Sequence, residues 1–139
     1  MAPPRHGTTV LVVEDDPSLR EFYRAALNHE HFRVVAVDDG FEALVWLDQH
    51  APDAIVLDLS LVRVNGRDVH REVRGRAETR NIPIVVVTGE DATDLNKNEL
   101  VCVLEKPITA ETLVEAVTHC LKRRPTGRTA VTADQRRGV

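Results

Sequence analysis

The sequence predicts an α/β fold in which five parallel strands form a doubly wound sheet covered by helices on both faces. Five short apolar runs are rich in β-branched residues and continuous rather than alternating, as in strands that are buried on both faces. The segments between most of these runs have the 3.6-residue period of amphipathic helices. Strand and helix thus alternate along the chain, which favours right-handed crossovers within a single sheet.

The expected strands take up the apolar runs in chain order. Their bounds are 8–13 (TTVLVV), 33–37 (RVVAV), 53–58 (DAIVLD), 82–88 (IPIVVVT) and 100–104 (LVCVL). Pro83 lies near the start of the fourth run, where a strand tolerates the loss of an N–H donor. Doubly wound sheets bind ligands beyond the carboxyl ends of their strands. The residues that follow each run are therefore the candidates for function.

The first two expected helices follow the first two strands. Asp16 can cap the first helix, and Pro17 suits its first turn. Four residues of this helix are predicted to share its apolar face: Leu19, Phe22, Ala26 and Leu27. The second helix, over residues 41–47, is predicted to bury three residues: Ala43, Leu44 and Leu47.

The later helical segments differ in how clearly their sequences show an apolar face. The third helix begins after Gly66, and only Val69 and Val73 are clear apolar positions among several arginines. Residues 89–99 (GEDATDLNKNE) are too few and too polar for a long fourth helix, so only one or two turns are expected there. The last helix opens at Thr109. Its predicted apolar stripe comprises Leu113, Val117, Cys120 and Leu121.

Length and composition narrow the function classes. A chain of 139 residues that is 42% hydrophobic and 29% charged predicts one domain with a hydrophobic core. Aromatic residues make up only 4%, which disfavours a stacking platform for nucleic acid. No apolar run approaches the roughly 18 residues of a membrane span, and no signal peptide is visible. A cytoplasmic location is therefore expected.

Cys102 and Cys120 lack metal-ligand spacing and are expected to be buried free thiols, with a redox role as the alternative.

The charge is unevenly distributed along the chain. The net charge is −4, yet residues 122–139 contain six Lys or Arg residues and one Asp. The rest of the chain is acidic and repels nucleic acid, so no direct DNA binding is expected from it. We predict one domain over residues 8–122 and a flexible basic tail over 123–139. The tail either solubilises the chain or contacts an acidic partner or nucleic acid.

Chemically suited side chains follow four of the five strands. Glu14 and Asp15 come after the first, Asp58 closes the third, Thr88 closes the fourth and Lys106 lies just beyond the fifth. If these strands are neighbours, three carboxylates, a hydroxyl and an ammonium converge on one cleft. Three carboxylates so close together repel one another unless a hard divalent cation balances them, and Mg²⁺ is the natural candidate.

Asp58 is the best placed nucleophile, because its strand is central in the predicted sheet. A carboxylate that attacks phosphorus yields an acyl phosphate, and Lys106 and Thr88 can bind the oxygens of a phosphoryl group. Each of these residues alone is most often a solvated cap or loop charge, and EDDP is also a helix start signal. Their joint occurrence at four strand ends favours a phosphoryl site.

Four motifs resemble one family, the receiver domain of two-component response regulators. The motifs are VLVVEDDPSLR (10–20), DAIVLDLSL with Gly66 (53–66), IVVVTGE (84–90) and LEKPI (104–108). The resemblance covers about residues 8–122. It implies a flavodoxin-like three-layer sandwich with strand order 2-1-3-4-5, like that of the chemotaxis regulator.

The resemblance also implies roles for the candidate residues. Asp58 would take a phosphoryl group from a histidine kinase or a histidine phosphotransfer protein, and the domain itself would catalyse both this transfer and the later dephosphorylation. Glu14, Asp15 and Asp58 would bind Mg²⁺ together with the backbone carbonyl of Ser60. Thr88 and Lys106 match the phosphoryl-binding residues of the family. The resemblance further implies a cis peptide bond between Lys106 and Pro107.

The sequence departs from the family pattern at three places. Val103 occupies the position where the family usually has the switch aromatic residue, and Val62 stands where proline is common. Only 17 residues separate Thr88 from Lys106, about one helical turn fewer than usual in the family. A shortened fourth helix is therefore expected, which remodels the face that many relatives use for dimerisation and output.

The sequence supports three hypotheses about function. The first is a single-domain response regulator whose Mg²⁺-dependent phosphorylation at Asp58 switches binding to an unknown downstream effector protein, with a homodimer left open. The second is a pseudo-receiver that binds a partner independently of phosphorylation, which Val62, Val103 and the short fourth helix favour. The third is an Asp-nucleophile phosphatase, which usually has a second Asp where Ser60 stands.

Overall fold

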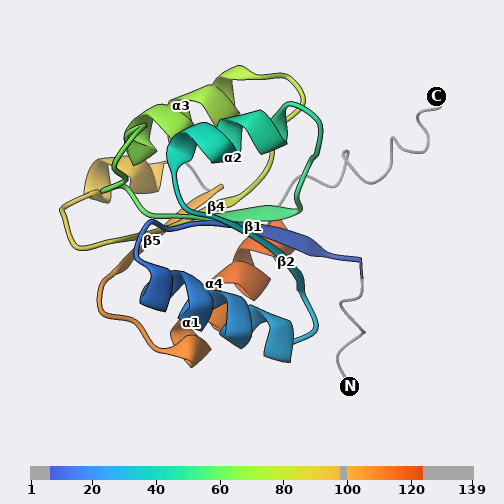
Figure 1. The fold of residues 1–139 in the computed structure, drawn as a ribbon, viewed down its shortest axis with the longest axis vertical. Helices are drawn as coiled ribbons and strands as arrows, with labels where there is room; N and C mark the ends of the chain where they lie inside the picture. The colour runs from blue at the N-terminus through green and yellow to red at the C-terminus, as the bar shows by residue number, and fades with distance from the viewer. Residues whose placement is uncertain (1–6, 98–99, 124–139) are drawn as a thin grey trace.

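Five strands, four α-helices and one 3₁₀ helix make up the computed structural model, which describes residues 7–97 and 100–123. Strand and helix alternate from the N-terminus onward (Figure 1). The elements are β1 (Thr9–Val13), α1 (Pro17–His29), β2 (Arg33–Val37), α2 (Gly40–Leu47), β3 (Ala54–Leu57), α3 (Gly66–Gly75), β4 (Ile84–Thr88), η1 (Thr93–Lys97), β5 (Val101–Glu105) and α4 (Ala110–Arg123).

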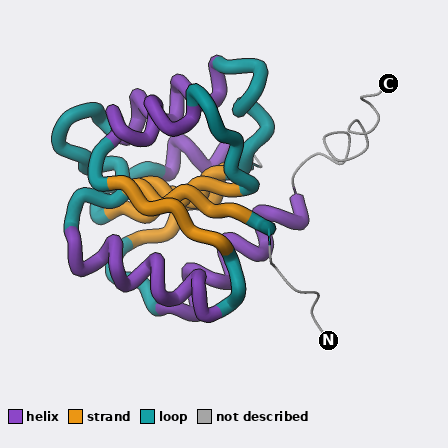
Figure 2. Tube along the Cα trace, turned by 45° about the vertical axis from the view of Figure 1, so that its right-hand side comes forward, coloured by secondary structure: helices purple, strands orange, loops and turns teal. Residues whose placement is uncertain are grey.

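The strands form one parallel sheet in the order β2-β1-β3-β4-β5. Helices α1 and α4 cover one face of the sheet, and α2 and α3 cover the other (Figures 1 and 2). This arrangement confirms the predicted fold class and strand order. The order changes direction between β1 and β3, so the carboxyl ends of these two strands flank the crevice in which such sheets bind ligands.

The hydrophobic core consists of two layers, one on each face of the sheet. Along β1, Leu11 and Val13 pack toward the layer that contains α2 and α3, whereas Val10 and Val12 pack toward α1 and α4. All residues of β3 and β4 are buried. Burial on both faces explains why the strands are continuous apolar runs rather than alternating ones.

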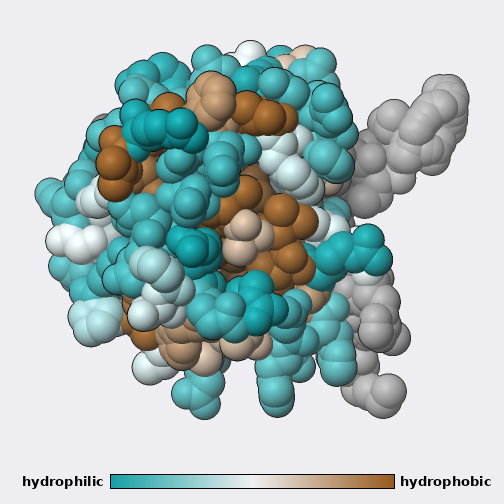
Figure 3. Space-filling model, viewed as in Figure 1, coloured by the Kyte–Doolittle hydropathy of each residue, from teal (hydrophilic) through white to brown (hydrophobic). Residues whose placement is uncertain are grey.

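The edge strands are less covered than the central ones. Most residues of β2 are half-buried, and Figure 3 shows apolar surface at the centre of the viewed face, over this edge. At the other edge, Cys102 of β5 is half-buried, whereas Cys120 of α4 is buried. The expectation that both thiols are buried is therefore wrong for Cys102, because an edge strand has a neighbour on one side only. Among the described helices, none has the length and apolarity that a membrane span requires.

The apolar face of α1 differs from the prediction by one residue. Tyr23 is 1% exposed, whereas the side chain expected inside, Phe22, is 41% exposed. Tyr23 lies four residues after Leu19 and four before Leu27, and residues four apart share a face of a helix. The periodicity therefore places Tyr23 in the core and leaves Phe22 at its margin.

The short fourth helix predicted from the sequence is the 3₁₀ helix η1. Asp91 starts it by accepting a hydrogen bond from the backbone N–H of Thr93 at 3.1 Å. Arg67, at the start of α3, holds this segment in place: its Nη1 lies 2.9 Å from Oδ2 of Asp94, and its Nη2 donates to the carbonyl of Asp91 at 3.1 Å. A guanidinium thus fixes a segment that has too few residues for a packed helix.

Gly66 is required where α3 meets the loop that follows β3. A Cβ at this position would lie 2.4 Å from the carbonyl oxygen of Asp58 and 2.4 Å from Cα of Leu59. Both atoms belong to the backbone, so the clash cannot be relieved by a side chain. We expect Gly66→Ala to lower the free energy of unfolding by about 2 to 4 kcal/mol, as measured by urea denaturation.

The matched control is Gly75→Ala at the end of the same helix, where a Cβ would meet nothing within 4 Å. This variant should be as stable as the wild type or slightly more stable, because alanine favours helix over glycine. Equal stability of the two variants would contradict the close backbone approach at Gly66.

Candidate functional site

The loop after β1 carries two acidic side chains on a firmly held backbone. Asp16 caps α1 by accepting hydrogen bonds from the backbone N–H groups of Ser18 and Leu19, at 2.9 and 3.3 Å. This confirms its predicted role. Arg20, one turn into the helix, reaches back with Nη1, which lies 3.0 Å from the carbonyl oxygen of Glu14. The helix cap and this guanidinium together set the direction in which the acidic side chains leave the loop.

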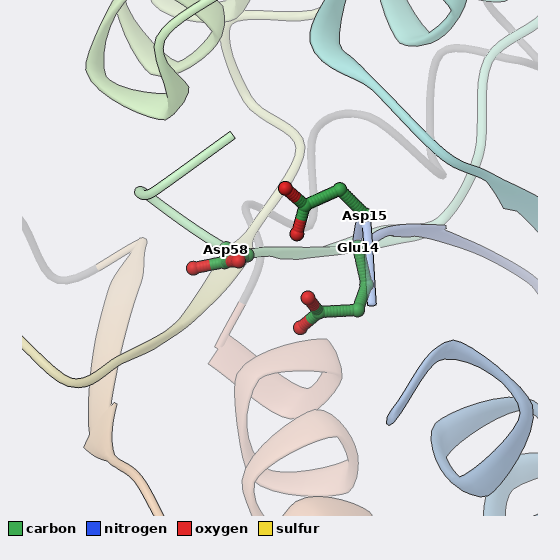
Figure 4. Close-up of side chains that lie close together, drawn as sticks. All are labelled: Glu14, Asp15 and Asp58. Atoms are coloured by element: carbon green, nitrogen blue, oxygen red, sulfur yellow. The ribbon is translucent and has the colours of Figure 1, made fainter. Parts of the chain in front are cut away.

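Asp58 brings a third carboxylate to the same place from β3. Its backbone N–H donates to the carbonyl of Val13 at 3.1 Å, which aligns the end of β3 with that of β1. Carboxylate oxygens of Glu14, Asp15 and Asp58 all lie within 4.8 Å of one another, and the side chains converge from the two strand ends (Figure 4). Glu14 is 1% exposed and Asp58 is 4% exposed. Two of the three carboxylates are therefore largely removed from water.

Lys106 supplies the positive charge of the site. Its backbone N–H donates to the carbonyl of Thr88 at 2.9 Å, and a cis peptide bond joins it to Pro107. Its Nζ lies 3.3 Å from Oε1 of Glu14 and 3.5 Å from Oδ2 of Asp58. One ammonium thus faces two buried carboxylates, which leaves the cluster with excess negative charge.

The pKa of Glu14 shows the effect of this excess. Burial is the main cause that raises its pKa, to about 7, and the charge of Asp58 raises it further. The backbone N–H of Asp16 and the ammonium of Lys106 oppose the rise only in part. In addition, Oε1 of Glu14 is buried and accepts no hydrogen bond from the described residues.

These features fit a hard divalent cation. Such a cation takes carboxylate oxygens as ligands, and it would satisfy the buried Oε1 while balancing the charges of Glu14, Asp15 and Asp58. The donor set contains neither sulfur nor imidazole, which favours Mg²⁺ over softer metals.

Two further side chains frame the phosphoacceptor candidate. Ser60 donates its backbone N–H to Oδ1 of Asp58 at 3.0 Å, and its hydroxyl donates to Oε2 of Glu90 at 3.2 Å. Thr88 is fully buried, and its Oγ1 accepts the backbone N–H of Glu90 at 3.1 Å. Glu90 therefore connects the loops that follow β3 and β4, and its Oε1 lies 3.8 Å from Nε of Arg67.

The structure brings most of the sequence-predicted residues together. Glu14, Asp15, Asp58 and Lys106 form one cluster, and Thr88 lies at the carboxyl end of the strand next to β3. Arg20 and Arg67 were not predicted. The position of Arg20 one turn after the helix cap is the only sequence signal that could have indicated its contact.

Val62 and Val103, the two residues that depart from the family pattern, lie in different surroundings. Val62 is 80% exposed in the loop before α3. Val103 is half-buried against the core layer that contains α2 and α3. This small aliphatic side chain cannot alternate between a buried and an exposed ring position as an aromatic switch residue would.

Three carboxylates and a lysine thus lie at the switch point of a doubly wound parallel sheet. The chain matches the family described as the response regulator receiver domain over residues 10–118, and it belongs to this family. It is 34% identical over 121 residues to the response regulator MprA of Mycobacterium tuberculosis, covering 82% of this chain and 50% of that protein. The chain therefore spans about half the length of this curated relative.

Solved structures of receiver domains are similar over most of the chain. A response regulator receiver protein from Sinorhizobium medicae has a TM-score of 0.75 at 30% identity, covering 85% of this chain and 97% of that one. The receiver domain of a sensor histidine kinase from Pseudomonas aeruginosa has a TM-score of 0.74 at 27% identity, covering 84% and 98%. The latter structure contains a magnesium ion coordinated in the active-site cleft.

Proposed function

We propose that this chain is a phosphorylation-dependent signalling switch whose phosphoacceptor is Asp58. The observation that carries the proposal is the position of the Asp58 carboxylate, which is almost buried between two other carboxylates and the ammonium of Lys106. The phosphoryl donor is a histidine kinase or a histidine phosphotransfer protein, consistent with membership of the receiver family. Mg²⁺ is held by Glu14, Asp15, Asp58 and the backbone carbonyl of Ser60.

In the proposed reaction a carboxylate oxygen of Asp58 attacks the phosphorus of a phosphohistidine. The new P–O bond forms as the P–N bond breaks, and the imidazole leaves. Bound Mg²⁺ would lower the charge repulsion between the carboxylates and the incoming phosphoryl group. The ammonium of Lys106 lies 3.5 Å from Asp58 and is placed to bind a phosphoryl oxygen once the acyl phosphate has formed.

Thr88 is the second phosphoryl-binding residue in this proposal. Its Oγ1 accepts the N–H of Glu90, so its own hydroxyl hydrogen remains a donor for a phosphoryl oxygen. A movement of Thr88 toward the phosphoryl group would pull on Glu90 and on the contact between Glu90 and Ser60. Phosphorylation would thereby alter the loop before η1 and switch binding to a downstream effector protein, without an aromatic ring at Val103.

The proposal includes the organisation of the chain. The receiver domain comprises residues 8–122. The predicted basic tail, 123–139, lies outside the described residues except for Arg123, which ends α4. The acidic domain binds proteins rather than DNA, and it acts in the cytoplasm, where histidine kinases present their phosphorylated domains.

The proposal is tested with a small phosphodonor. The chain is incubated with acetyl phosphate with Mg²⁺ or with EDTA, and its intact mass is then measured. We expect one added phosphoryl group with Mg²⁺ and at most a trace with EDTA. Failure of acetyl phosphate and of a panel of phosphorylated histidine kinases to modify a folded, Mg²⁺-binding protein would instead support the pseudo-receiver hypothesis, which the valine at position 103 and the short η1 favour.

Removal of the Lys106 ammonium should make stability depend on the metal. Lys106→Met keeps most of the aliphatic stem but leaves Glu14 and Asp58 without their cation, and unpaired buried charges are destabilising. In EDTA we expect the free energy of unfolding to fall by about 1 to 3 kcal/mol. Mg²⁺ should restore part of this loss, because it binds the same carboxylates.

Lys122→Met, at an exposed position near the end of α4, is the control. It should be as stable as the wild type both in EDTA and in Mg²⁺. If Lys106→Met were as stable as the wild type in EDTA, Lys106 would not be balancing the buried carboxylates.

A further inference from the structure

The strand β2 lies at one edge of the sheet and pairs with a single neighbour. Its register with β1 is continuous from Arg33 to Val37. The residues of β2 are half-buried except for Arg33, which is exposed. Figure 3 shows apolar surface over this edge at the centre of the viewed face. Within the described part of the chain, an apolar strand edge is thus open to solvent.

The backbone of β2 has hydrogen-bonding groups on its outer side that no described residue uses. The N–H of Arg33 donates to the residue before β1 at 2.9 Å, and the carbonyl of Val37 accepts from the residue after β1 at 3.2 Å. Backbone groups of successive residues in a strand point in opposite directions, so those of Val34 and Ala36 point away from β1. Two N–H donors and two carbonyl acceptors are therefore available to another strand.

The sequence of β2 lacks the features that usually keep an edge strand from pairing. Such strands often contain proline, lysine or a bulge. The sequence RVVAV contains neither proline nor lysine, and its unbroken register with β1 leaves no room for a bulge. This edge is therefore able to accept a further strand.

The two ends of β2 carry opposite charges. Arg33 starts the strand, whereas Asp38 and Asp39 follow it, and Glu42 lies in the first turn of α2. Of these three carboxylates, only Asp39 forms an ion pair with a described residue, Arg63. A second copy of β2 in antiparallel orientation would bring each positive end to a negative end, whereas a parallel copy would bring like charges together. The strand is thus complementary to itself.

We propose that β2 pairs with β2 of a second copy of this chain in antiparallel orientation, which joins two five-stranded sheets into one. The two-fold axis of this dimer is perpendicular to the sheet. Val34 exchanges both of its outer backbone hydrogen bonds with Ala36 of the second copy, and the axis repeats this pair. The same register places Arg33 near Asp39 of the second copy, on one face of the joined sheet.

The apolar surface of α2 supports this arrangement. A groove of about 510 Å³ adjoins the carboxyl end of β2, and its lining includes Val37, Phe41, Val45 and Trp46. Phe41 is 52% exposed and Val45 is 51% exposed. A two-fold axis perpendicular to the sheet keeps the α2 helices of both copies on the same face, so their apolar side chains meet above the joined strands. Burial of this apolar surface stabilises the association.

The dimer does not involve the proposed phosphoacceptor site. Because the two sheets run in opposite directions, the strand ends that carry Glu14, Asp58 and Lys106 lie at opposite edges of the joined sheet. Pairing therefore requires neither phosphorylation nor Mg²⁺. A measurement without either one tests the dimer separately from the proposed function.

Sedimentation velocity of the whole reduced chain in EDTA, without a phosphodonor, tests the proposal. We expect a monomer at low micromolar concentration and a dimer fraction that grows toward millimolar concentration. Hydrogen exchange in the peptide that contains β2 should slow as the dimer forms, because the amides of Val34 and Ala36 enter hydrogen bonds. A chain that stays monomeric at all concentrations, or a dimer in which this exchange is unchanged, would overturn the proposal.

Two substitutions at exposed positions locate the interface. Arg33→Glu brings like charges together at both ends of the paired strands, and Val45→Glu places a carboxylate in the apolar contact between the α2 helices. Each should weaken dimerisation at least about tenfold.

The matched controls are Arg80→Glu and Val62→Glu, which change an exposed arginine and an exposed valine outside this surface. Both should dimerise as the wild type does, and circular dichroism checks that all four variants are folded. A dimer that Arg33→Glu and Val45→Glu leave intact, or that the controls weaken equally, would contradict β2 as the interface.

Discussion

Replacement of Asp58 by asparagine is expected to abolish phosphorylation of the chain by acetyl phosphate in the presence of Mg²⁺. An amide nitrogen is not a nucleophile comparable to a carboxylate, so the rate of phosphoryl gain should fall at least about a hundredfold. The fold should persist, because asparagine has nearly the same shape and its side-chain oxygen can still accept the N–H of Ser60. Intact mass spectrometry measures the first effect, and thermal unfolding measures the second.

A matched control is Asp48→Asn, which changes an exposed carboxylate at the end of α2 whose partner is Arg76. This variant should be phosphorylated at the wild-type rate. Phosphorylation of Asp58→Asn at that same rate would place the phosphoacceptor elsewhere and contradict the proposed function.

Substitution of Glu14 by glutamine is expected to stabilise the metal-free protein while it abolishes stabilisation by Mg²⁺. The carboxyl of Glu14 is buried, and both this burial and the nearby charge of Asp58 favour its neutral form. An amide can imitate that neutral form, because it also has one acceptor oxygen and one donor. The variant should therefore fit the metal-free site better than an ionised glutamate does.

The raised pKa of Glu14 determines how the stability of the wild type changes with pH. The folded-state pKa of Glu14 is about 7 and its ordinary value is 4.5, so the folded state binds this proton more tightly than the unfolded state. The wild type therefore loses stability as pH rises from about 4.5 to about 7, and the loss is complete above that window. At pH 8 in EDTA we expect Glu14→Gln to be more stable by about 1 to 3 kcal/mol, whereas near pH 4.5 the difference should vanish.

In saturating Mg²⁺ the wild type should instead be more stable than Glu14→Gln. Binding to the folded state alone raises the stability of the wild type in proportion to the logarithm of the metal concentration, and the variant lacks one of the carboxylates that bind it. Urea denaturation at pH 8 with EDTA and with Mg²⁺ provides the measurement. A variant that is less stable than the wild type in EDTA would show that Glu14 is not a source of electrostatic strain.

The sequence predicted the sheet well because burial on both faces leaves a strong signal. The five apolar runs agree with the five strands to within two residues at each end, and some of the residues that lie outside the strands have other roles. Asp53, for example, precedes β3 and accepts the backbone N–H of Thr9 at 2.8 Å. The prediction placed Phe22 on the buried face of α1 because its side chain is apolar. Tyr23 is buried instead, because its spacing from the other core residues of the helix is more favourable.

The core of the site was predictable for a topological reason. The carboxyl ends of neighbouring parallel strands meet at one edge, so the residues after β1, β3 and β5 were expected to converge, and Glu14, Asp58 and Lys106 do so. The contacts of Arg20 and Arg67 could not be predicted in the same way. A long flexible side chain can reach several partners, and its choice depends on loops whose course the sequence pattern does not define.

The most direct measurement of the central proposal locates the phosphoryl group itself. The chain is phosphorylated with acetyl phosphate and Mg²⁺, the acyl phosphate is reduced with borohydride to give homoserine at the modified aspartate, and tryptic peptides are sequenced by fragmentation. We predict homoserine at position 58 and nowhere else. Homoserine at Asp15 or another acidic residue, with unchanged Asp58, would contradict the proposed function.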